Sequence, residues 1–328
     1  MRALRCNEYG STDVLVMEDL PDLVPGEGEV VVDVVAAAAN FPDVLLIADQ
    51  YQISVPVPFT PGSEFAGVVR LVGPGVPEVA VGDRVTGASM IGAFAEQIKV
   101  PATSLHAVDP AVDLRTAAAF GVAHRTAYLA LRTVANVGPG DWVVVLGAAG
   151  GVGLAAVELA HVLGARVLAA ASTEEKLSVC RDKGAEATVN YRTENLKERI
   201  KEITGGGADA VIDPVGGPWA EQALRSMKWG GQFVTVGFAS GEIPRIPLNL
   251  VLLKGPVITG FTMQGIALNR ADEVARHEAE LWNLLATGKV IPHVGAAFPL
   301  EEGAQALTEL AERRATGKVL VEPASHAH

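Results

Sequence analysis

Cysteine is scarce in this chain of 328 residues, which holds only Cys6 and Cys180. Two thiols are too few for a disulfide framework or for a four-thiolate zinc site, and nothing about them requires an oxidising compartment. Cys6 falls in the first expected strand and Cys180 near the end of an expected helix, where buried thiols are commonly inert. The sequence therefore predicts a cytoplasmic protein that uses no cysteine in catalysis.

Long hydrophobic runs and an excess of positive charge are also missing. The uncharged run between Asp141 and Glu158 is shorter than the roughly 20 apolar residues of a membrane-spanning helix. The N-terminus lacks the apolar core of a secretory signal. With 26 Lys and Arg against 38 Asp and Glu, the net charge of -12 repels phosphate backbones. We expect no membrane and no nucleic acid as partner, and a small molecule as substrate.

The chain does contain two different patterns of apolar segments and turns, and the first gives way to the second near residue 122. Residues 1–120 alternate short Val-rich runs with Gly and Pro turns, which predicts short antiparallel strands. Later, apolar strands alternate with amphipathic helices, as in a parallel sheet covered on both faces. The expected strands there are 142–147, 165–171, 187–191, 209–215, 231–237 and 257–261. The expected helices are 152–163, 174–183, 194–203, 219–228, 271–287 and 301–315, before a last strand, KVLVE.

A glycine-rich turn joins the first of these later strands to its helix. The turn reads GAAGGVG, and its A-x-G-x-x-G core starts at Ala148. Without side chains, such a turn lets backbone N–H groups and the positive end of the helix meet a pyrophosphate. A simple packing turn is the alternative. The pattern predicts a dinucleotide site at Gly147, Ala148, Gly150, Gly151, Val152 and Gly153.

The end of the next strand indicates which dinucleotide binds. NAD sites usually carry an Asp or Glu about 20 residues beyond the glycines, whereas this strand ends at Ser172. Ser172, Lys176 and Tyr191 can instead accommodate a 2′-phosphate, which favours NADPH. Lys176 could also be an ordinary solvated helix residue, because Glu174 and Glu175 beside it would oppose a phosphate.

Motifs along nearly the whole chain resemble the medium-chain dehydrogenase/reductase superfamily, and within it the zinc-independent NADPH:quinone oxidoreductases. They are PGSEFAGVV, GDRV, HRTAYLAL, GAAGGVG, STEEKL, VNYR, GGGADAVIDPVGG and GKVLVEP, in family order. The resemblance implies an α/β protein with a GroES-like, mostly-β catalytic domain at 1–122 and 266–328. It implies a Rossmann domain with a doubly wound parallel sheet at 123–265, which binds NADPH.

The zinc ligands of the alcohol dehydrogenases in this superfamily are missing. The resemblance places a Cys within the segment 40–43 and a His at the position of Ser63, and neither is present. Glu64 remains, but one carboxylate does not make a site that needs three or four ligands. We expect Glu64 to support the structure by hydrogen bonding and the protein to bind no metal.

Without a Lewis acid, reduction must rely on holding the nicotinamide against an acceptor that needs little activation. The resemblance implies catalytic roles for Asn40, Asp43 and Tyr51: Asn40 would hold the ribose or the nicotinamide, and Tyr51 would donate a hydrogen bond or proton. For Asp43, merely bracing the loop is the alternative. For Tyr51, an aromatic ring resting on a loop is an equal alternative. Further cofactor contacts are implied for Thr126, Gly216, Gly237, Phe238, Phe261 and Lys318, although Lys318 could equally be a surface lysine.

Hydride transfer from NADPH to quinones is the function that this pattern favours. The main alternative is reduction of an activated C=C bond in an enone or a 2-enoyl thioester, with Tyr51 as the proton donor. A non-catalytic nucleotide-sensing or RNA-binding protein is the least supported interpretation, because the net charge opposes RNA. The strand at 257–261 would leave an apolar sheet edge, which predicts a homodimer through this last Rossmann strand.

Overall fold

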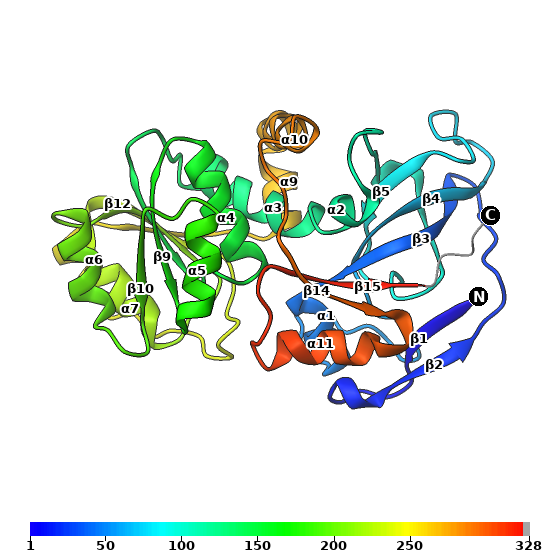
Figure 1. The fold of residues 1–328 in the computed structure, drawn as a ribbon, viewed down its shortest axis with the longest axis horizontal. Helices are drawn as coiled ribbons and strands as arrows, with labels where there is room; N and C mark the ends of the chain where they lie inside the picture. Colours follow the sequence, from blue (N-terminus) through cyan, green and yellow to red (C-terminus); the bar gives the residue numbers. More distant parts are fainter. Residues whose placement is uncertain (324–328) are drawn as a thin grey trace. The chain divides into compact units, whose positions relative to one another are not determined.

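The computed structural model describes residues 1–323, which form two compact units (Figure 1). One unit, called the terminal unit here, consists of residues 1–122 and the chain from Pro292 onward. The other, the central unit, spans Ala123–Ile291. One unit is built on a mostly antiparallel sheet and the other on a parallel sheet, as the predicted α/β fold class requires.

The second boundary between the units lies later than the predicted change at residues 265/266. The structure places 266–291 in the central unit. There Ile266 and Val274 are buried against Leu129 in a small apolar cluster. The helix that carries Val274 is held by this burial, which the sequence rhythm alone does not reveal.

The terminal unit is built on a mostly antiparallel sheet of seven strands in the order β14-β15-β3-β4-β5-β7, with β6 also paired to β3. Its central strand β3 reads EVVVDVVAAAA, and β-branched Val residues favour such a strand. Pairing of Val319 with Ala39 brings β15, from the end of the described chain, beside β3. The strands are β3 (Glu29–Ala39), β4 (Glu64–Val72), β5 (Arg84–Ala88), β6 (Gln97–Pro101), β7 (Leu105–Ala107), β14 (Val294–Pro299) and β15 (Lys318–Glu322). The helices are α1 (Phe41–Ile47), α2 (Leu114–Ala118) and α11 (Gly303–Ala311).

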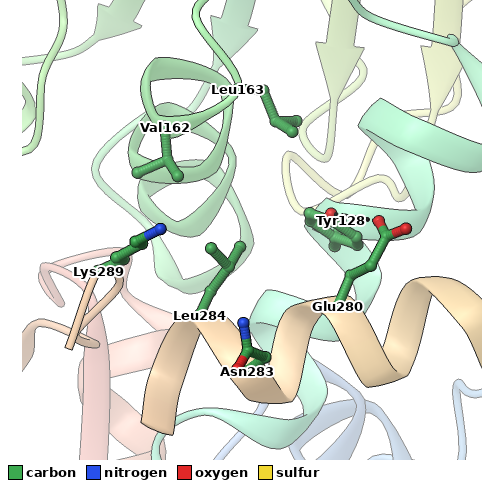
Figure 2. A pocket seen from close by; sticks show the side chains of 7 residues that line it. All are labelled: Tyr128, Val162, Leu163, Glu280, Asn283, Leu284 and Lys289. Carbon is green, nitrogen blue, oxygen red and sulfur yellow. Dashed lines mark hydrogen bonds between the residues drawn. The ribbon is translucent and has the colours of Figure 1, made fainter. Parts of the chain in front are cut away.

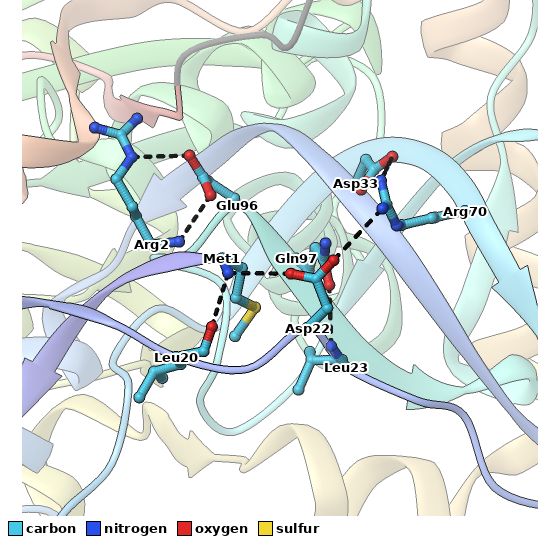
Figure 3. Close-up of polar contacts among 9 residues, drawn as sticks. All are labelled: Met1, Arg2, Leu20, Asp22, Leu23, Asp33, Arg70, Glu96 and Gln97. Atoms are coloured by element: carbon cyan, nitrogen blue, oxygen red, sulfur yellow. Dashed lines mark hydrogen bonds and ion pairs between the residues drawn. The ribbon is translucent and has the colours of Figure 1, made fainter.

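A separate hairpin, β1 (Arg2–Cys6) and β2 (Leu15–Asp19), packs beside this sheet. Figure 3 shows the polar contacts near its ends: Arg2 pairs with Glu96 at 2.9 Å, and Arg70 lies between Asp22 and Asp33. These ion pairs are partly exposed, and exposed pairs contribute little to stability. The buried side chains of Leu4 and Cys6 therefore do most to hold the hairpin in place.

The central unit contains a parallel sheet of six strands in the order β10-β9-β8-β11-β12-β13. The order reverses between β8 and β11, as in a doubly wound Rossmann sheet. The strands are β8 (Trp142–Leu146), β9 (Arg166–Ala171), β10 (Ala187–Asn190), β11 (Ala208–Asp213), β12 (Met227–Thr235) and β13 (Val257–Gly260). The helices are α3 (Gly121–Tyr128, which begins in the terminal unit), α4 (Gly151–Val162), α5 (Glu174–Asp182), α6 (Leu196–Thr204), α7 (Pro218–Arg225), α8 (Asn249–Lys254), α9 (Met263–Asn269) and α10 (Ala271–Ala286).

The predicted strands and helices of this half are present, with small shifts at their ends. The helix predicted to reach residue 228 ends at Arg225, because strand β12 already begins at Met227. Residues 129–134 continue α3 as a π-helix, which the sequence did not indicate. No helix within residues 1–323 is both long and apolar enough to cross a membrane.

Candidate functional site

The predicted cofactor residues of the central unit follow the carboxyl ends of neighbouring parallel strands. In sheet order these residues are Tyr191 after β10, Ser172 after β9, Gly147 after β8, Gly216 after β11, Gly237 after β12 and Phe261 after β13. Carboxyl ends of parallel strands share one edge, and open α/β sheets bind ligands there, where the strand order reverses. The fold thus gathers at one edge residues that span most of the central unit in sequence.

The turn between β8 and α4 can hold a pyrophosphate with backbone atoms alone. Gly150 is the N-cap of α4, and a Cβ added there would have Gly147 O as its nearest atom, at 3.4 Å. A Cβ on Gly153 would lie 2.3 Å from the same oxygen, so only glycine fits. Gly147 has a φ of 56°, which also favours glycine. Gly147 and Gly153 therefore shape the turn, whereas Gly150 leaves an open approach to the positive end of the helix.

Asp213 shapes the next turn and is not among the predicted site residues. Its Oδ1 accepts the backbone N–H groups of Val215 and Gly216, both at 2.8 Å, and burial raises its pKa. A Cβ on Gly216 would lie 2.9 Å from the ring of Phe238, so the turns after β11 and β12 pack together. An Asp followed by small residues at a strand end, as in DPVGG, is the local signal for such a turn.

Two cations lie close together near the end of β9. Lys176 is half-buried in the first turn of α5, and burial together with the positive charge of Arg192 lowers its pKa. Glu174, expected to oppose a phosphate, forms an ion pair with Arg181 instead. Arg192 directly follows Tyr191, whose ring contacts Trp219 with the centroids 4.5 Å apart. Lys176 and Arg192 supply positive charge at this end of the edge, next to the exposed Glu175. Arg192 was missed because a lone Arg in VNYR carries no motif.

Thr126 and Phe261 lie at the apolar cluster that contains Leu129. The Thr126 hydroxyl contacts the sulfur of Met263 at 3.7 Å, and the side chains of Phe261 and Met263 pack on the cluster. Phe238, by contrast, is 38% exposed. Of these three predicted cofactor residues, Phe238 is thus the one most open to a ligand.

A buried polar cluster surrounds Asn40 in the terminal unit. The Asn40 Nδ2 lies 3.1 Å from Ala38 O, 3.4 Å from Ser63 Oγ and 3.2 Å from Glu64 Oε2. Its Oδ1 accepts a hydrogen bond from Lys318 Nζ at 2.6 Å. Three strand ends therefore meet here: β3 just before Asn40, β4 at Glu64 and β15 at Lys318.

Lys318 is not the surface lysine that the sequence offered as an alternative. Its side chain is 3% exposed, and its ammonium group donates to Ala39 O at 3.2 Å and to Glu64 Oε2 at 3.0 Å as well as to Asn40. Three acceptors occupy the three hydrogens of the ammonium group. Lys318 has no donor left for a cofactor, because an ammonium group can donate only three hydrogen bonds.

Asp43 and Tyr51 have different surroundings. Asp43 is fully buried, and its Oδ2 accepts the backbone N–H of Asn40 at 2.8 Å. Burial raises the pKa of Asp43 to about 7, although the Asn40 N–H, Ser63 and Lys318 all oppose the rise. Tyr51 is partly buried against the core of the terminal unit. Asp43 therefore braces the first turn of α1.

The residues at the predicted zinc positions do not fit a catalytic zinc ion. Asn40 offers an amide, Ser63 a hydroxyl, and the Glu64 carboxylate is already paired with an ammonium group. Zinc sites in enzymes need three protein ligands drawn from thiolate, imidazole and carboxylate. Within residues 1–323, no group of three or more His, Cys, Asp or Glu side chains is placed to hold a metal ion.

A hollow of about 600 Å³ lies elsewhere in the central unit, beside α10. Figure 2 shows its lining, in which Tyr128 donates a hydrogen bond to Glu280 at 2.9 Å. Burial and Glu280 raise the pKa of Tyr128 to about 12, so the phenol stays neutral. None of the predicted site residues lines this hollow. We therefore treat it as distinct from the strand-end edge.

Comparisons with known proteins cover both units. Residues 26–110 match the family model "Alcohol dehydrogenase GroES-like domain", and residues 151–279 match "Zinc-binding dehydrogenase". A quinone oxidoreductase-like protein 2 homolog of Nematostella vectensis is 37% identical over 98% of this chain and 88% of its own length. Quinone oxidoreductase-like protein 2 of Mus musculus is also 37% identical, over 98% of this chain and 91% of its own length.

A solved structure is similar to this chain over nearly its whole length. The crystal structure of Escherichia coli quinone oxidoreductase complexed with NADPH matches with a TM-score of 0.91 and 30% identity, over 98% of this chain and 100% of that chain. The similarity thus extends through both units and through every segment that contributes a candidate site residue.

Proposed function

Because this chain belongs to the quinone oxidoreductase family of the medium-chain dehydrogenase/reductase superfamily, we propose that it transfers hydride from NADPH to a quinone without a metal ion. It is an oxidoreductase, and NADPH is its cofactor, as in the Escherichia coli structure. The observation that carries the proposal is the row of strand-end residues beside the open glycine turn, with cations at one end of the row.

Different residues along this edge would hold different parts of the cofactor. Backbone N–H groups from Gly150 to Gly153 would hold the pyrophosphate, and Ser172, Lys176 and Tyr191 the 2′-phosphate, with added charge from Arg192. Thr126, Gly216, Gly237, Phe238 and Phe261 would line the path towards the nicotinamide, and Asn40 would hold the ribose or the nicotinamide itself. When bound, NADPH supplies the hydride. The chain's part is to orient and shield it, which can lower the barrier considerably.

Zinc independence rests on the residue types at the ligand positions. Asn40 and Ser63 are not zinc ligands, and Glu64 is neutralised by Lys318. Elemental analysis of protein purified without added metal is expected to find less than stoichiometric zinc, and a chelator is expected to leave turnover unchanged. Stoichiometric zinc together with activity lost to the chelator would contradict the proposal.

A substrate panel tests the choice between the quinone and its alternatives. NADPH consumption is measured with a simple quinone, a 2-enone and a 2-enoyl thioester, first in the wild type and then in Tyr51→Phe. A reduced quinone can take its protons from solvent, so we expect quinone turnover of Tyr51→Phe to stay within about tenfold. An enoyl substrate needs a placed acid, which contributes about 10²–10⁴-fold. Turnover of the enoyl thioester alone, lost in Tyr51→Phe, would instead assign a C=C reductase, and no turnover with any of the three would favour a nucleotide sensor.

We also propose a homodimer through β13, the last strand of the central sheet. Val257 and Ile258 on this strand are 46% and 42% exposed, and Trp229 on the neighbouring β12 is 81% exposed. Unpaired apolar edges favour pairing with a second copy. Light scattering at micromolar concentration is expected to give the mass of a dimer for the wild type and of a monomer for Ile258→Lys, and a monomeric wild type would contradict this.

A further inference from the structure

We propose that Lys318 and Glu64 are positioning residues that fix the side-chain amide of Asn40, so that Asn40 offers the cofactor an acceptor and never a donor. The inference rests on the proposed function, which assigns Asn40 to the nicotinamide end of NADPH. It changes the role of Lys318 from a cofactor contact to a residue that acts through Asn40. It also gives Glu64, the carboxylate left without a zinc site, a role in the reaction.

The orientation of the amide follows from the chemistry of its two charged neighbours. An ammonium group can only donate hydrogen bonds and a carboxylate can only accept them. Lys318 Nζ lies 2.6 Å from one end of the amide and Glu64 Oε2 lies 3.2 Å from the other. Turning the amide over would set its NH₂ group against the ammonium and its oxygen against the carboxylate. Only one orientation therefore satisfies both neighbours.

The hydrogens of the Asn40 amide are already used inside the unit. Nδ2 carries two, and Ala38 O, Ser63 Oγ and Glu64 Oε2 all lie within hydrogen-bond distance of it. Oδ1 accepts from Lys318 and keeps a second lone pair. The free capacity of the side chain is therefore to accept. The ligand group that meets it must be a donor, such as a ribose hydroxyl or the NH₂ of the nicotinamide carboxamide.

The ion pair is held rigidly enough to impose this orientation. The Glu64 and Lys318 side chains are 1% and 3% exposed. The second Glu64 oxygen, Oε1, accepts the backbone N–H of Val122 at 2.5 Å, and a Cβ on Gly121 would lie 3.1 Å from that oxygen. Buried pairs often add little stability over an apolar replacement, so a specific arrangement is a better reason for this one.

A mutant cycle tests whether the pair acts through Asn40. The variants are Asn40→Ala, the pair replacement Glu64→Gln with Lys318→Met, which leaves no buried charge unpaired, and the three changes combined. NADPH affinity is measured by fluorescence titration, kcat/KM with a quinone, and folding by thermal melting. We expect Asn40→Ala and the pair replacement each to weaken NADPH binding by about tenfold, and the combination to be no weaker than Asn40→Ala alone. Losses that multiply in the combined variant would overturn the inference.

A swap of the two side chains tests the acceptor role itself. Asn40→Asp keeps an acceptor but sets a second carboxylate against Glu64, so it should lose more affinity than Asn40→Ala. Adding Glu64→Gln restores one carboxylate, one amide and one ammonium group, with an acceptor still at position 40. We expect this double variant to recover most of the lost affinity. If Asn40 instead donates to the cofactor, the double variant will stay as weak as Asn40→Asp, because a carboxylate has no N–H group, and the inference fails.

A matched control separates positioning from a general loss of stability. Glu158 and Lys183 form an ion pair in the central unit, 2.8 Å apart and 12% and 19% exposed. Replacing them by Gln and Met should lower the melting temperature. In this background, Asn40→Ala should still weaken NADPH binding by its full factor, so that any losses of affinity multiply. An Asn40→Ala variant with unchanged affinity and turnover would refute the cofactor role of Asn40 in the proposed function. If Asn40→Ala weakens NADPH binding but the Glu64/Lys318 replacement does not, only the positioning of Asn40 by the pair is refuted.

Discussion

In the central unit, most candidate residues lie just after the strands of one parallel sheet or in the first turn of the helix that follows. In the terminal unit, Asn40, Glu64 and Lys318 come from three segments of the chain and meet because β3 pairs with both β4 and β15. The candidate site of the central unit consists of backbone groups, turns and partly exposed cations. That of the terminal unit is a buried ionic cluster. Changes to the first should therefore affect cofactor binding more than folding, and changes to the second should affect both.

The largest effect is expected from breaking the ionic cluster on one side only. Lys318→Met leaves the Glu64 carboxylate buried without its cation, which typically costs about 3–5 kcal/mol of unfolding free energy. Urea denaturation measures this loss. Adding Glu64→Gln removes the unpaired charge and is expected to restore most of the stability. A single variant as stable as the wild type would mean that water reaches Glu64.

Asp43 should give the terminal unit a stability that depends on pH. Its pKa is raised from 3.8 to about 7 on folding, so between about pH 4 and pH 7 the folded state holds a proton that the unfolded state has released. The contribution of Asp43 to stability is therefore full below about pH 4 and falls as the pH rises towards 7, by up to ~1.4 kcal/mol per pH unit. Urea unfolding of the wild type and of Asp43→Asn at several pH values measures the difference. Parallel curves for the two proteins would contradict the buried, protonated carboxyl.

The two glycines of the α4 turn should separate folding from cofactor binding. Gly153→Ala forces a Cβ to within 2.3 Å of Gly147 O and should cost about 3 kcal/mol of stability. Gly150→Ala meets nothing closer than 3.4 Å, so it should keep the fold and weaken NADPH binding. Thermal melting and cofactor titration test the pair. Equal melting temperatures for the two variants would show that the turn is looser than its geometry implies.

The smallest effect is expected in the discrimination between NADPH and NADH. Lys176→Ala removes one charged contact to the 2′-phosphate, which should cost roughly 1.5–3 kcal/mol with NADPH and little with NADH. The ratio of kcat/KM for the two cofactors measures it. Arg192→Ala is the companion variant, because Arg192 is close enough to lower the pKa of Lys176. A ratio unchanged by both substitutions would place the phosphate elsewhere.

These contrasts also explain what the sequence could predict. The strands, the glycine turn and Ser172, Lys176 and Tyr191 follow from local patterns, because each lies at a fixed place relative to a strand end. The surroundings of Lys318 do not, since they depend on a pairing across most of the chain, and a lysine before an apolar strand resembles a surface residue. Arg192 and the paired state of Glu174 depend on side-chain directions, which neither spacing nor composition encodes. Residues 324–328, part of the predicted catalytic domain, lie outside the described residues.

The discontinuous terminal unit has a consequence for synthesis on the ribosome. Asn40 and Glu64 are made early, whereas Lys318 emerges only after the whole central unit. The nascent terminal unit therefore cannot neutralise Glu64 until β15 appears, while the central unit already has all its strands and can fold as a unit. We expect a released chain truncated shortly after residue 300 to resist protease in the central unit and to be cleaved in residues 1–122. Equal resistance of both segments in this truncated chain would show that the early half folds without its missing cation.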